Sequence, residues 1–285
     1  MKNQTQKHRT QKHQTIEVHR SNGVASIWLN RPEVRNALNA TMVAELTEAL
    51  ESANADRSIR AVALGAHGSA FCAGGDLVAS QRLGKGPAAA NSRDAKALSG
   101  LFHRLYSMDK PTVARVHGTA YAGGVGLIAA CDIAVASQDA EFCLSEVKVG
   151  MAAASILPYL LRAMGERHTR RFVLSAEVFP AAEAYRIGLV HELAVPTELD
   201  NVVEEMLTML VKGGPAAQST AKKLIHRFAE QPLTEAVVSA TAHEYAALRS
   251  SDEGREGITA FLEKREPRWR TSIAKPSPAR RKKAR

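Results

Sequence analysis

Residues 118–150 read GTAYAGGVGLIAACDIAVASQDAEFCLSEVKVG, and this stretch says most about the fold. A glycine-rich turn at Gly123 and Gly124 opens a short apolar segment, and a single carboxylate, Glu146, follows two strand-like segments. Glycine lets the backbone approach a ligand closely, and amides at the start of a helix favour negative charge. A carboxylate that returns near such a turn predicts proton transfer beside an anion site.

A second glycine-rich turn, AFCAGGDL at 70–77, also follows a short apolar strand. Paired turns of this kind can direct two backbone N–H groups at one point. A carbonyl oxygen placed there is stabilised as it becomes an oxyanion, by about 3–4 kcal/mol for one donor. Either turn alone is equally compatible with an ordinary tight turn. Their joint occurrence, each after a strand, favours thioester chemistry through an enolate.

The pattern around these turns predicts an α/β body followed by a helical region. Beyond Pro196 the apolar residues fall only at helical spacing. Residues 81–91, rich in Gly, Ala and Pro, are expected to be a mobile loop. A hairpin is expected over 16–29, helices from 41 and over 94–108, 167–176 and 181–187, a helix ending at Gly165, and strands over 60–66, 111–118, 133–137, 141–144 and 189–195.

The positive charge of the chain is concentrated at its two ends. The net charge of the 285 residues is +9, but residues 1–15 and 271–285 hold ten basic residues and no acidic ones, which leaves −1 for residues 16–270. We therefore expect disordered basic tails at 1–14 and 271–285. The neutral body argues against a nucleic-acid-binding face.

Several other classes of protein are disfavoured by missing patterns. No apolar run approaches the roughly 20 residues that span a bilayer, and the N-terminus has no apolar signal core. The three cysteines lack CxxC spacing, which suits a reducing, cytoplasmic location. The histidines show no metal-ligand spacing, so no metal is expected, and no GxSxG nucleophile motif is present.

Six motifs together resemble the enoyl-CoA hydratase/isomerase (crotonase) family, over roughly residues 16–270. They match the family in order and spacing, and the stretch from Gly123 to Gly150 looks most like methylglutaconyl-CoA-type hydratases of branched-chain and acyclic-terpene degradation. The motifs are NALNA at 36–40, FCAGGDL at 71–77, KPTVARVHGTAYAGG at 110–124, CDIAVAS at 131–137, AEFCLSEVKVG at 140–150 and GITAFLEKREPRW at 257–269.

The resemblance implies a fold, a site and a set of partners. The fold is an α/β spiral of ββα units over 15–200 with a C-terminal helical trimerisation region over 201–270, in trimers or dimers of trimers. Coenzyme A is part of the substrate, without a prosthetic group or a membrane partner. By motif position, the resemblance assigns the oxyanion hole to the Gly75 and Gly123 amides and catalysis to Glu146, and it assigns coenzyme A contacts to Arg35, Ala73 and Lys264, the last often in a neighbouring subunit.

One position departs from the family pattern. Hydratases of the family usually carry a first glutamate three residues after the oxyanion glycine, where this chain has Gly126. Three interpretations follow: Glu146 acts alone on water and the α-carbon, it moves a proton between carbons two and four as in family isomerases, or the substrate brings its own carboxylate, as in 3-methylglutaconyl-CoA. We expect an acyl-CoA hydro-lyase, with the isomerase as the alternative.

Other candidate residues have structural interpretations that outweigh catalysis. These are Asp76 in its own turn, Asp132 in CDI, Glu141 on a strand edge, His117 at a strand end and Cys72 beside the first turn.

Two rival functions are also considered. Gly124-Val-Gly126-Leu-Ile-Ala129 matches the GxGxxA dinucleotide fingerprint, but six residues separate it from the preceding strand and the helix is too short. A degenerate, non-catalytic scaffold is the other rival, with the basic tails binding a partner.

Overall fold

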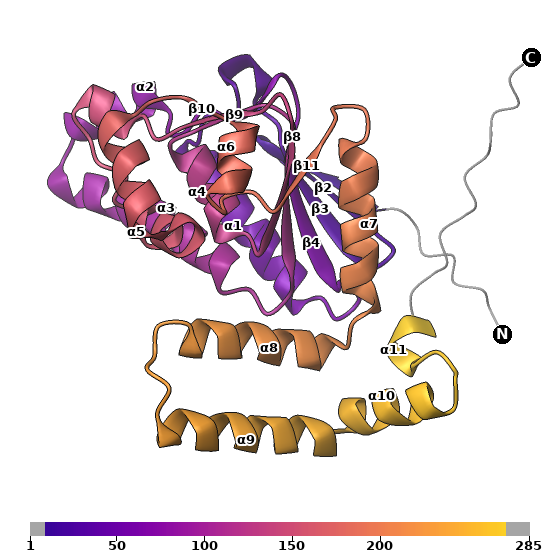
Figure 1. The fold of residues 1–285 in the computed structure, drawn as a ribbon. Helices are drawn as coiled ribbons and strands as arrows, with labels where there is room; N and C mark the ends of the chain where they lie inside the picture. Colours follow the sequence, from indigo (N-terminus) through magenta and orange to yellow (C-terminus); the bar gives the residue numbers. More distant parts are fainter. Residues whose placement is uncertain (1–8, 272–285) are drawn as a thin grey trace, which may run out of the picture.

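The computed structural model describes residues 9–271, which form two β-sheets, helices on both faces of the larger sheet, and further helices at the C-terminal end (Figure 1). The larger sheet has the strand order β1-β2-β3-β4-β6-β8-β11 and the smaller one β10-β9-β7-β5. The strands are β1 Arg9–Lys12, β2 Ile16–Ser21, β3 Val24–Leu29, β4 Ala61–Ala66, β5 Ala70–Cys72, β6 Thr112–Val116, β7 Thr119–Tyr121, β8 Ile133–Ser137, β9 Glu141–Cys143, β10 Phe179–Pro180 and β11 Glu192–Ala194.

The helices surround the larger sheet and continue beyond it (Figure 1). Two short 3₁₀ helices are present: η1 Pro32–Val34 precedes α1, and η2 Glu146–Val149 follows β9. The α-helices are α1 Ala40–Ala55, α2 Leu77–Gly84, α3 Ala88–Tyr106, α4 Gly123–Ala130, α5 Leu157–Ser175, α6 Ala181–Arg186, α7 Leu199–Lys212, α8 Pro215–Phe228, α9 Glu235–Ser250, α10 Asp252–Leu262 and α11 Arg268–Thr271.

The larger sheet begins with the predicted hairpin. Strands β2 and β3 alternate between buried and partly exposed residues, as expected for strands with one face on a core. Asn22 and Gly23 both have positive φ, 48° and 80°, which is the backbone of the tight turn that fits the twist of a hairpin. Strand β4 is buried at all six positions, as an apolar central parallel strand should be.

The chain alternates between the two sheets, and this alternation builds the site. Strands β4, β6 and β8 are parallel neighbours in the larger sheet, and each is followed by β5, β7 or β9 of the smaller sheet. Strands β5, β7 and β9 are again parallel neighbours. The carboxyl ends of parallel strands meet at one edge of a sheet, so the turns after β5, β7 and β9 lie side by side.

Two apolar clusters hold the helices to the larger sheet. One lies between the sheet and α1, α3, α4 and α5, and its largest fully buried side chains include Phe71, Phe102 and Phe142. The other lies on the opposite face, where α7 covers the sheet; it contains Ala61, Ala63, Val113, Val135, Leu199, Val203, Leu207 and Val211. The expected domain boundary at 200–201 falls inside α7, which packs on the sheet with the body.

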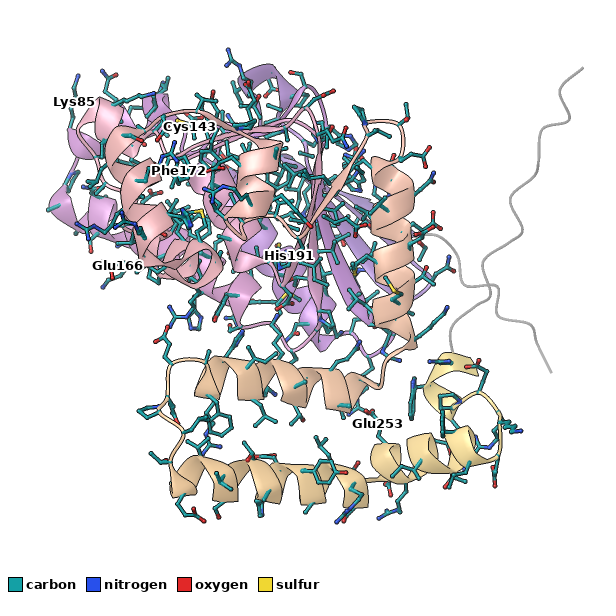
Figure 2. All side chains as sticks on the ribbon, viewed as in Figure 1. Lys85, Cys143, Glu166, Phe172, His191 and Glu253 are labelled. Atoms are coloured by element: carbon teal, nitrogen blue, oxygen red, sulfur yellow. The ribbon has the colours of Figure 1, made fainter. Side chains whose placement is uncertain are left out.

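Helices α8, α9 and α10 extend below the sheet in Figure 1. Lys222 of α8 is buried and donates to Asp132 at 2.7 Å, which fastens α8 to the body. Glu253, labelled in Figure 2, accepts hydrogen bonds from the first amides of α8 and so joins α10 to α8. Large apolar side chains remain exposed on this region, among them Leu233 at 92% and Phe261 at 83%.

The structure differs from the expected elements in two places. Residues 81–91 are helical at both ends, within α2 and α3, rather than a mobile loop, because the alanine-rich run from 88 favours helix. Arg9–Lys12 form strand β1 on the edge of the hairpin, where a tail without structure was expected. The rest of the two expected basic tails, residues 1–8 and 272–285, lies outside the described residues.

The other expected elements are confirmed with small shifts. The chain is non-helical at Gly165, where φ is 72°, so the expected helix end there is present as a kink within α5. The last strand is shorter than expected, with β11 covering Glu192–Ala194. Within residues 9–271, no helix combines the length and apolar character needed to cross a membrane.

Candidate active site

The two glycine-rich turns and Glu146 follow three adjacent parallel strands. The first turn comes after β5, the second after β7, and Glu146 lies three residues after β9. The second turn is tied to the end of β9, because Ala122 N donates to Cys143 O at 2.8 Å. The first turn is tied to the NALNA segment, because Leu38 N donates to Gly74 O at 2.7 Å. The topology therefore brings all three segments to one edge.

The two turns are in direct contact, and the contact requires glycine. Gly74 has φ +92°, and a Cβ there would lie 2.7 Å from Ala122 Cβ. A Cβ on Gly123 would lie 3.8 Å from Gly74 Cα. Ala122 itself has φ 48° and ψ −117°, a sparsely populated conformation that costs roughly 1–3 kcal/mol. This strain orients the chain as it enters α4 and marks the turn as a functional candidate.

Two backbone donors at this edge are unused. Among the described residues, the amides of Gly75 and Gly123 form no hydrogen bond with another part of the chain. Gly75 is exposed, and a Cβ built on it meets no atom within 4 Å, so the space beside it is open. Gly123 is the first residue of α4, where helix amides have no partner within the helix. The first turn of α4 thus presents donors to an incoming carbonyl or anion.

Glu146 has a buried oxygen without a partner. It begins η2 and is half-buried, and its Oε2 is buried with no hydrogen-bond partner in the described part of the chain. Burial raises the pKa of the Glu146 carboxyl above its ordinary value of 4.5, and a hydrogen bond from its own backbone amide opposes that shift. Buried polar atoms are nearly always paired, so an unpaired carboxylate oxygen at the sheet edge that also carries the two free amides is a strong candidate for chemistry.

Gly126 offers no room for a second carboxylate. It lies one turn into α4, and a Cβ built on it would be 2.1 Å from Ile156 Cγ2 and 3.1 Å from Phe102 Cε1. Any side chain at this position would require Ile156 to move. The space that a glutamate would need is therefore occupied by the apolar core.

The residues that the resemblance assigns to coenzyme A divide into two groups. Arg35 and Ala73 lie together, because Ala73 N donates to Arg35 O at 2.9 Å. Arg35 is exposed, has φ 51°, and forms no ion pair with any residue in 9–271. Lys264 follows α10, which lies below the sheet and apart from α4 in Figure 1. Within one chain the structure therefore does not bring Lys264 to the other site residues.

The residues with structural interpretations have structural partners. Asp76 caps α2 through Ala79 N, and Asp132 accepts from Thr112 N at 2.8 Å as well as from Lys222. Glu141 is exposed on β9. His117 donates from Nε2 to Gly68 O at 2.9 Å.

The Cys72 thiol is likewise structural. It is fully buried, and burial raises its pKa to about 12, so it is not an available nucleophile.

Two residues that position the glycine-rich turns are not predicted from the sequence to have this role. Asn36 is fully buried, and its side chain accepts from Arg31 N and donates to His67 O and Ala70 O. It holds the NALNA segment against β5, which positions the first turn. Its place in the NALNA motif is the one sequence feature that points to this supporting role, because burial of a polar side chain cannot be predicted from composition. The strained Ala122 gave no signal at all, since alanine carries no preference for positive φ.

The dinucleotide interpretation does not fit the packing. Gly124 and Gly126 are buried, and a Cβ on Gly124 would lie 2.4 Å from Cys72 O. Both glycines serve close packing of α4 on β5 and α5, so neither can approach a pyrophosphate. Within residues 9–271, no group of three His, Cys, Asp or Glu side chains is arranged to hold a metal ion.

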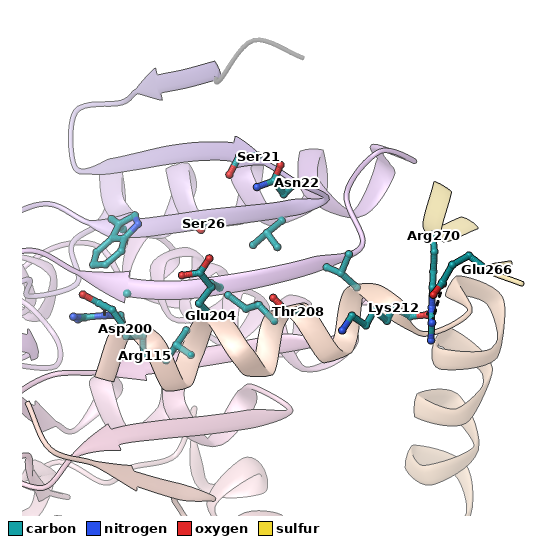
Figure 3. A pocket seen from close by; sticks show the side chains of 17 residues that line it. Ser21, Asn22, Ser26, Arg115, Asp200, Glu204, Thr208, Lys212, Glu266 and Arg270 are labelled. Carbon is teal, nitrogen blue, oxygen red and sulfur yellow. Dashed lines mark hydrogen bonds and ion pairs between the residues drawn. The ribbon is translucent and has the colours of Figure 1, made fainter. Parts of the chain in front are cut away.

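A cavity of about 810 Å³ lies elsewhere, between α7 and the opposite face of the larger sheet (Figure 3). It contains none of Gly75, Gly123 or Glu146. Free amides and an unpaired carboxylate identify a site better than the size of a cavity does, so we place the chemistry at the edge formed by β5, β7 and β9.

Comparisons with known proteins identify the family of the chain. Residues 19–272 match the family model for enoyl-CoA hydratase/isomerase. A Thermus thermophilus protein assigned as an enoyl-CoA hydratase is 37% identical over 86% of this chain and 97% of its own length. The 2,3-dehydroadipyl-CoA hydratase of Escherichia coli is 32% identical over 88% and 96%. The crystal structure of an enoyl-CoA hydratase from Shewanella pealeana superposes with a TM-score of 0.87 at 34% identity, covering 90% of this chain and 96% of that one.

Proposed function

Because the chain belongs to the enoyl-CoA hydratase/isomerase family and has its crotonase fold, we propose that it adds water across the α,β double bond of an enoyl-coenzyme A thioester. One observation supports this proposal most directly. Two unused backbone amides and one carboxylate with an unpaired oxygen follow three neighbouring strands. That set of groups matches the needs of chemistry beside a thioester carbonyl.

The amides of Gly75 and Gly123 act on the thioester oxygen. When hydroxide adds to the β-carbon, the π electrons move toward the carbonyl and the oxygen becomes negative. Two fixed N–H donors stabilise that oxyanion without reorganising, and each contributes about 3–4 kcal/mol to the transition state. The open space beside Gly75 leaves room for the thioester.

Glu146 moves the proton. As a carboxylate it takes a proton from water while the water oxygen bonds to the β-carbon, and it then delivers a proton to the α-carbon. The sum is addition of one H and one OH across the double bond, and Glu146 ends ionised as it began. The raised pKa of Glu146 makes its carboxylate a stronger base than an exposed glutamate.

The packing at Gly126 supports two finer alternatives. Since no carboxylate fits there, Glu146 works without a second one from that position. A single glutamate is sufficient to move a proton between carbons two and four, so a Δ3-Δ2 enoyl-CoA isomerase is the alternative activity. A carboxylated branched substrate such as 3-methylglutaconyl-CoA would instead supply the missing acid itself. The Escherichia coli relative, named for a dehydroadipyl thioester, fits a carboxylated acyl group.

Coenzyme A and a second copy of the chain are the proposed partners. Exposed Arg35 and the backbone at Ala73 lie beside the first turn, where they can contact the phosphates and the adenine end of the cofactor. The exposed apolar side chains of the C-terminal helical region, such as Leu233 between α8 and α9 and Phe261 on α10, favour burial against another subunit in a trimer or a dimer of trimers. Lys264 would then reach coenzyme A in that neighbour. The three free cysteines suit a cytoplasmic location.

A panel of thioesters tests the proposed reaction. We expect the protein to remove the conjugated double bond of 2-enoyl-CoA substrates, followed by ultraviolet absorbance, and to prefer carboxylated acyl groups if the substrate supplies an acid. Glu146→Gln should lower turnover at least roughly 100-fold while coenzyme A affinity is retained. Glu141→Gln is the matched control, because Glu141 is exposed on the strand that precedes Glu146.

Each result has a distinct meaning. Conversion of 3-enoyl substrates alone would make the protein an isomerase. An effect of Glu146→Gln below threefold would remove Glu146 from the mechanism. Activity that survives deletion of both tails and is lost in Glu146→Gln would exclude a non-catalytic scaffold.

A further inference from the structure

The cavity beside α7 is a groove that runs along the helix and is not used by the proposed chemistry. Its floor is formed by outward-facing side chains of β3 and β4, such as Val24 and Ala63, and its wall by α7. The groove lies on the face of the larger sheet opposite α4, so its occupancy and the chemistry at Glu146 can be tested separately (Figures 1 and 3).

Charged residues lie at both ends of the groove. Figure 3 shows Lys212, Glu266 and Arg270 at one end, and Arg115 with Asp200 at the other. Arg270 pairs with Glu266 at 2.9 Å and Arg115 with Asp200 at 2.5 Å, so these four charges are neutralised in place.

The exposed side of α7 carries acids that the described residues do not neutralise. Glu204 lines the groove, and Glu205 is exposed next to it. Neither forms an ion pair with any residue in 9–271. Acids in the first turn of a helix are favourable through the helix dipole, which accounts for Asp200 but not for Glu204 and Glu205, which lie beyond that turn.

The C-terminal segment of the chain starts at the other end of this groove. Arg270 of α11 lines the groove, and its Nε donates to Lys212 O at 2.9 Å, so α11 is fixed at the C-terminal end of α7. The chain continues for 14 residues, 272–285, as SIAKPSPARRKKAR, with six basic residues and no acidic one. The other end of the chain, residues 1–15, holds only four basic residues.

The length of this segment fits the groove. Helix α7 has 14 residues and is about 21 Å long at 1.5 Å per residue. At about 3.3 Å per extended residue, the seven residues SIAKPSP cover roughly the same distance. Their two prolines favour an extended chain, and six of the seven residues are uncharged, which suits the apolar floor. Glu204 and Glu205 lie eight and seven residues before Lys212, about 11–12 Å along α7, so these seven residues are more than long enough to bring the basic run to both acids.

We propose that residues 272–285 dock along the groove of their own chain, with the basic run ARRKKAR against the acidic side of α7. The docked segment covers the apolar floor between β3 and α7 and neutralises Glu204 and Glu205. The N-terminal segment 1–8, which precedes the edge strand β1, carries only two lysines.

Binding in trans tests the charge pairing. A fluorescent peptide of residues 272–285 is titrated onto the protein lacking those residues, and anisotropy is measured. We expect saturable binding that weakens at least about tenfold in Glu204→Lys/Glu205→Lys and at high salt, because exposed ion pairs are screened. Glu48→Lys, an exposed acid on α1 at the opposite face, is the matched control and should leave the affinity unchanged. No binding, or equal weakening by Glu48→Lys, would overturn the proposal.

Crosslinking in the full chain tests which segment occupies the groove. A carbodiimide joins lysines to nearby carboxylates, and we expect links from Lys282 or Lys283 to Glu204 or Glu205. Mixing chains with and without ¹⁵N distinguishes links within one chain from links between chains. Links only between chains would assign the groove to a second copy, and links only from residues 1–8 would assign it to the N-terminal segment. A small molecule kept by the native protein after tail deletion would assign the groove to that ligand. Each of these three outcomes contradicts the proposal.

Discussion

Among single residues, Glu146 is expected to lower the free energy of unfolding at neutral pH, because the burial that raises its pKa also opposes its charged form. Burial raises its pKa in the folded protein, whereas the unfolded chain titrates near 4.5. Below pH 4.5 the carboxyl is protonated in both states and burial costs nothing. As pH rises above 4.5, the unfolded chain ionises first. Above the raised pKa of the folded protein, the carboxylate must be held buried, and the free energy of unfolding is lower than at acid pH. Glu146→Gln should therefore be more stable than the native protein at pH 7–8.

Chemical denaturation at two pH values measures this effect. The gain in the free energy of unfolding in Glu146→Gln should appear at neutral pH and vanish below pH 4.5. A variant that is less stable than the native protein at neutral pH would show that the carboxylate has a stabilising partner.

The pH dependence of turnover depends on the same carboxyl group. Hydration needs Glu146 ionised, so kcat/KM should fall as pH decreases through its pKa, with a midpoint above 4.5. Steady-state rates between pH 4.5 and 9 on a stable enoyl thioester give this profile. A flat profile would mean that another group accepts the proton.

Gly74 and Gly75 are adjacent glycines with different constraints. Gly74→Ala should lower stability, because its methyl would meet Ala122 at 2.7 Å and its φ is positive. Gly75→Ala should fold normally, since its methyl enters open space, but it should slow turnover by about 100-fold because that methyl displaces the thioester from the amide. Thermal unfolding and kcat, measured on both variants, separate the two roles. Normal turnover in Gly75→Ala would move the oxyanion hole elsewhere.

At the scale of elements, α4 depends on close contact with the start of α5. Gly126→Ala should destabilise the protein by about 1–3 kcal/mol, because the added methyl overlaps Ile156. Ile156→Ala alone should also destabilise, through a cavity in the core. The double variant should lose less than the sum, since each change relieves the other. Urea unfolding of the four proteins gives this coupling energy, and simple additivity would contradict the contact.

Much of this element arrangement could be predicted from the sequence. The hairpin at 16–29, the buried strands and the glycine turns were identified from periodicity and turn residues, and the family motifs fixed their order. The helix at 88 and strand β1 were missed, because alanine-rich and glutamine-rich segments carry little apolar periodicity. The contact of Gly126 with Ile156 could not be predicted, because it joins residues thirty positions apart through packing alone.

At the scale of the whole molecule, the C-terminal helices expose apolar surface that a second subunit would cover. Phe261 is 83% exposed and Leu262 is 74% exposed, beside Lys264. Phe261→Glu should shift the protein toward smaller species and reduce turnover, because a buried charge opposes association. Light scattering coupled to size-exclusion chromatography measures the size. A native protein that is already monomeric would contradict the proposed assembly and the role of Lys264.

The position of Lys264 shows that its expected contact with coenzyme A depends on a second subunit. Its motif predicted a contact with coenzyme A, and Arg35 and Ala73 do lie beside the first turn. Lys264 lies with α10, on the helices that extend away from the sheet (Figure 1). Sequence motifs fix which residues share a function, whereas contacts between subunits depend on surfaces that only assembly brings together.

A crystal structure of the Glu146→Gln protein with a bound enoyl-coenzyme A would show directly whether Gly75, Gly123 and residue 146 surround the thioester. We predict the thioester oxygen within hydrogen-bond distance of both the Gly75 and the Gly123 amides, with the side chain at position 146 facing the α- and β-carbons. A thioester bound with its oxygen on other donors, or with residue 146 turned away from those carbons, would contradict the proposed oxyanion hole and the role of Glu146.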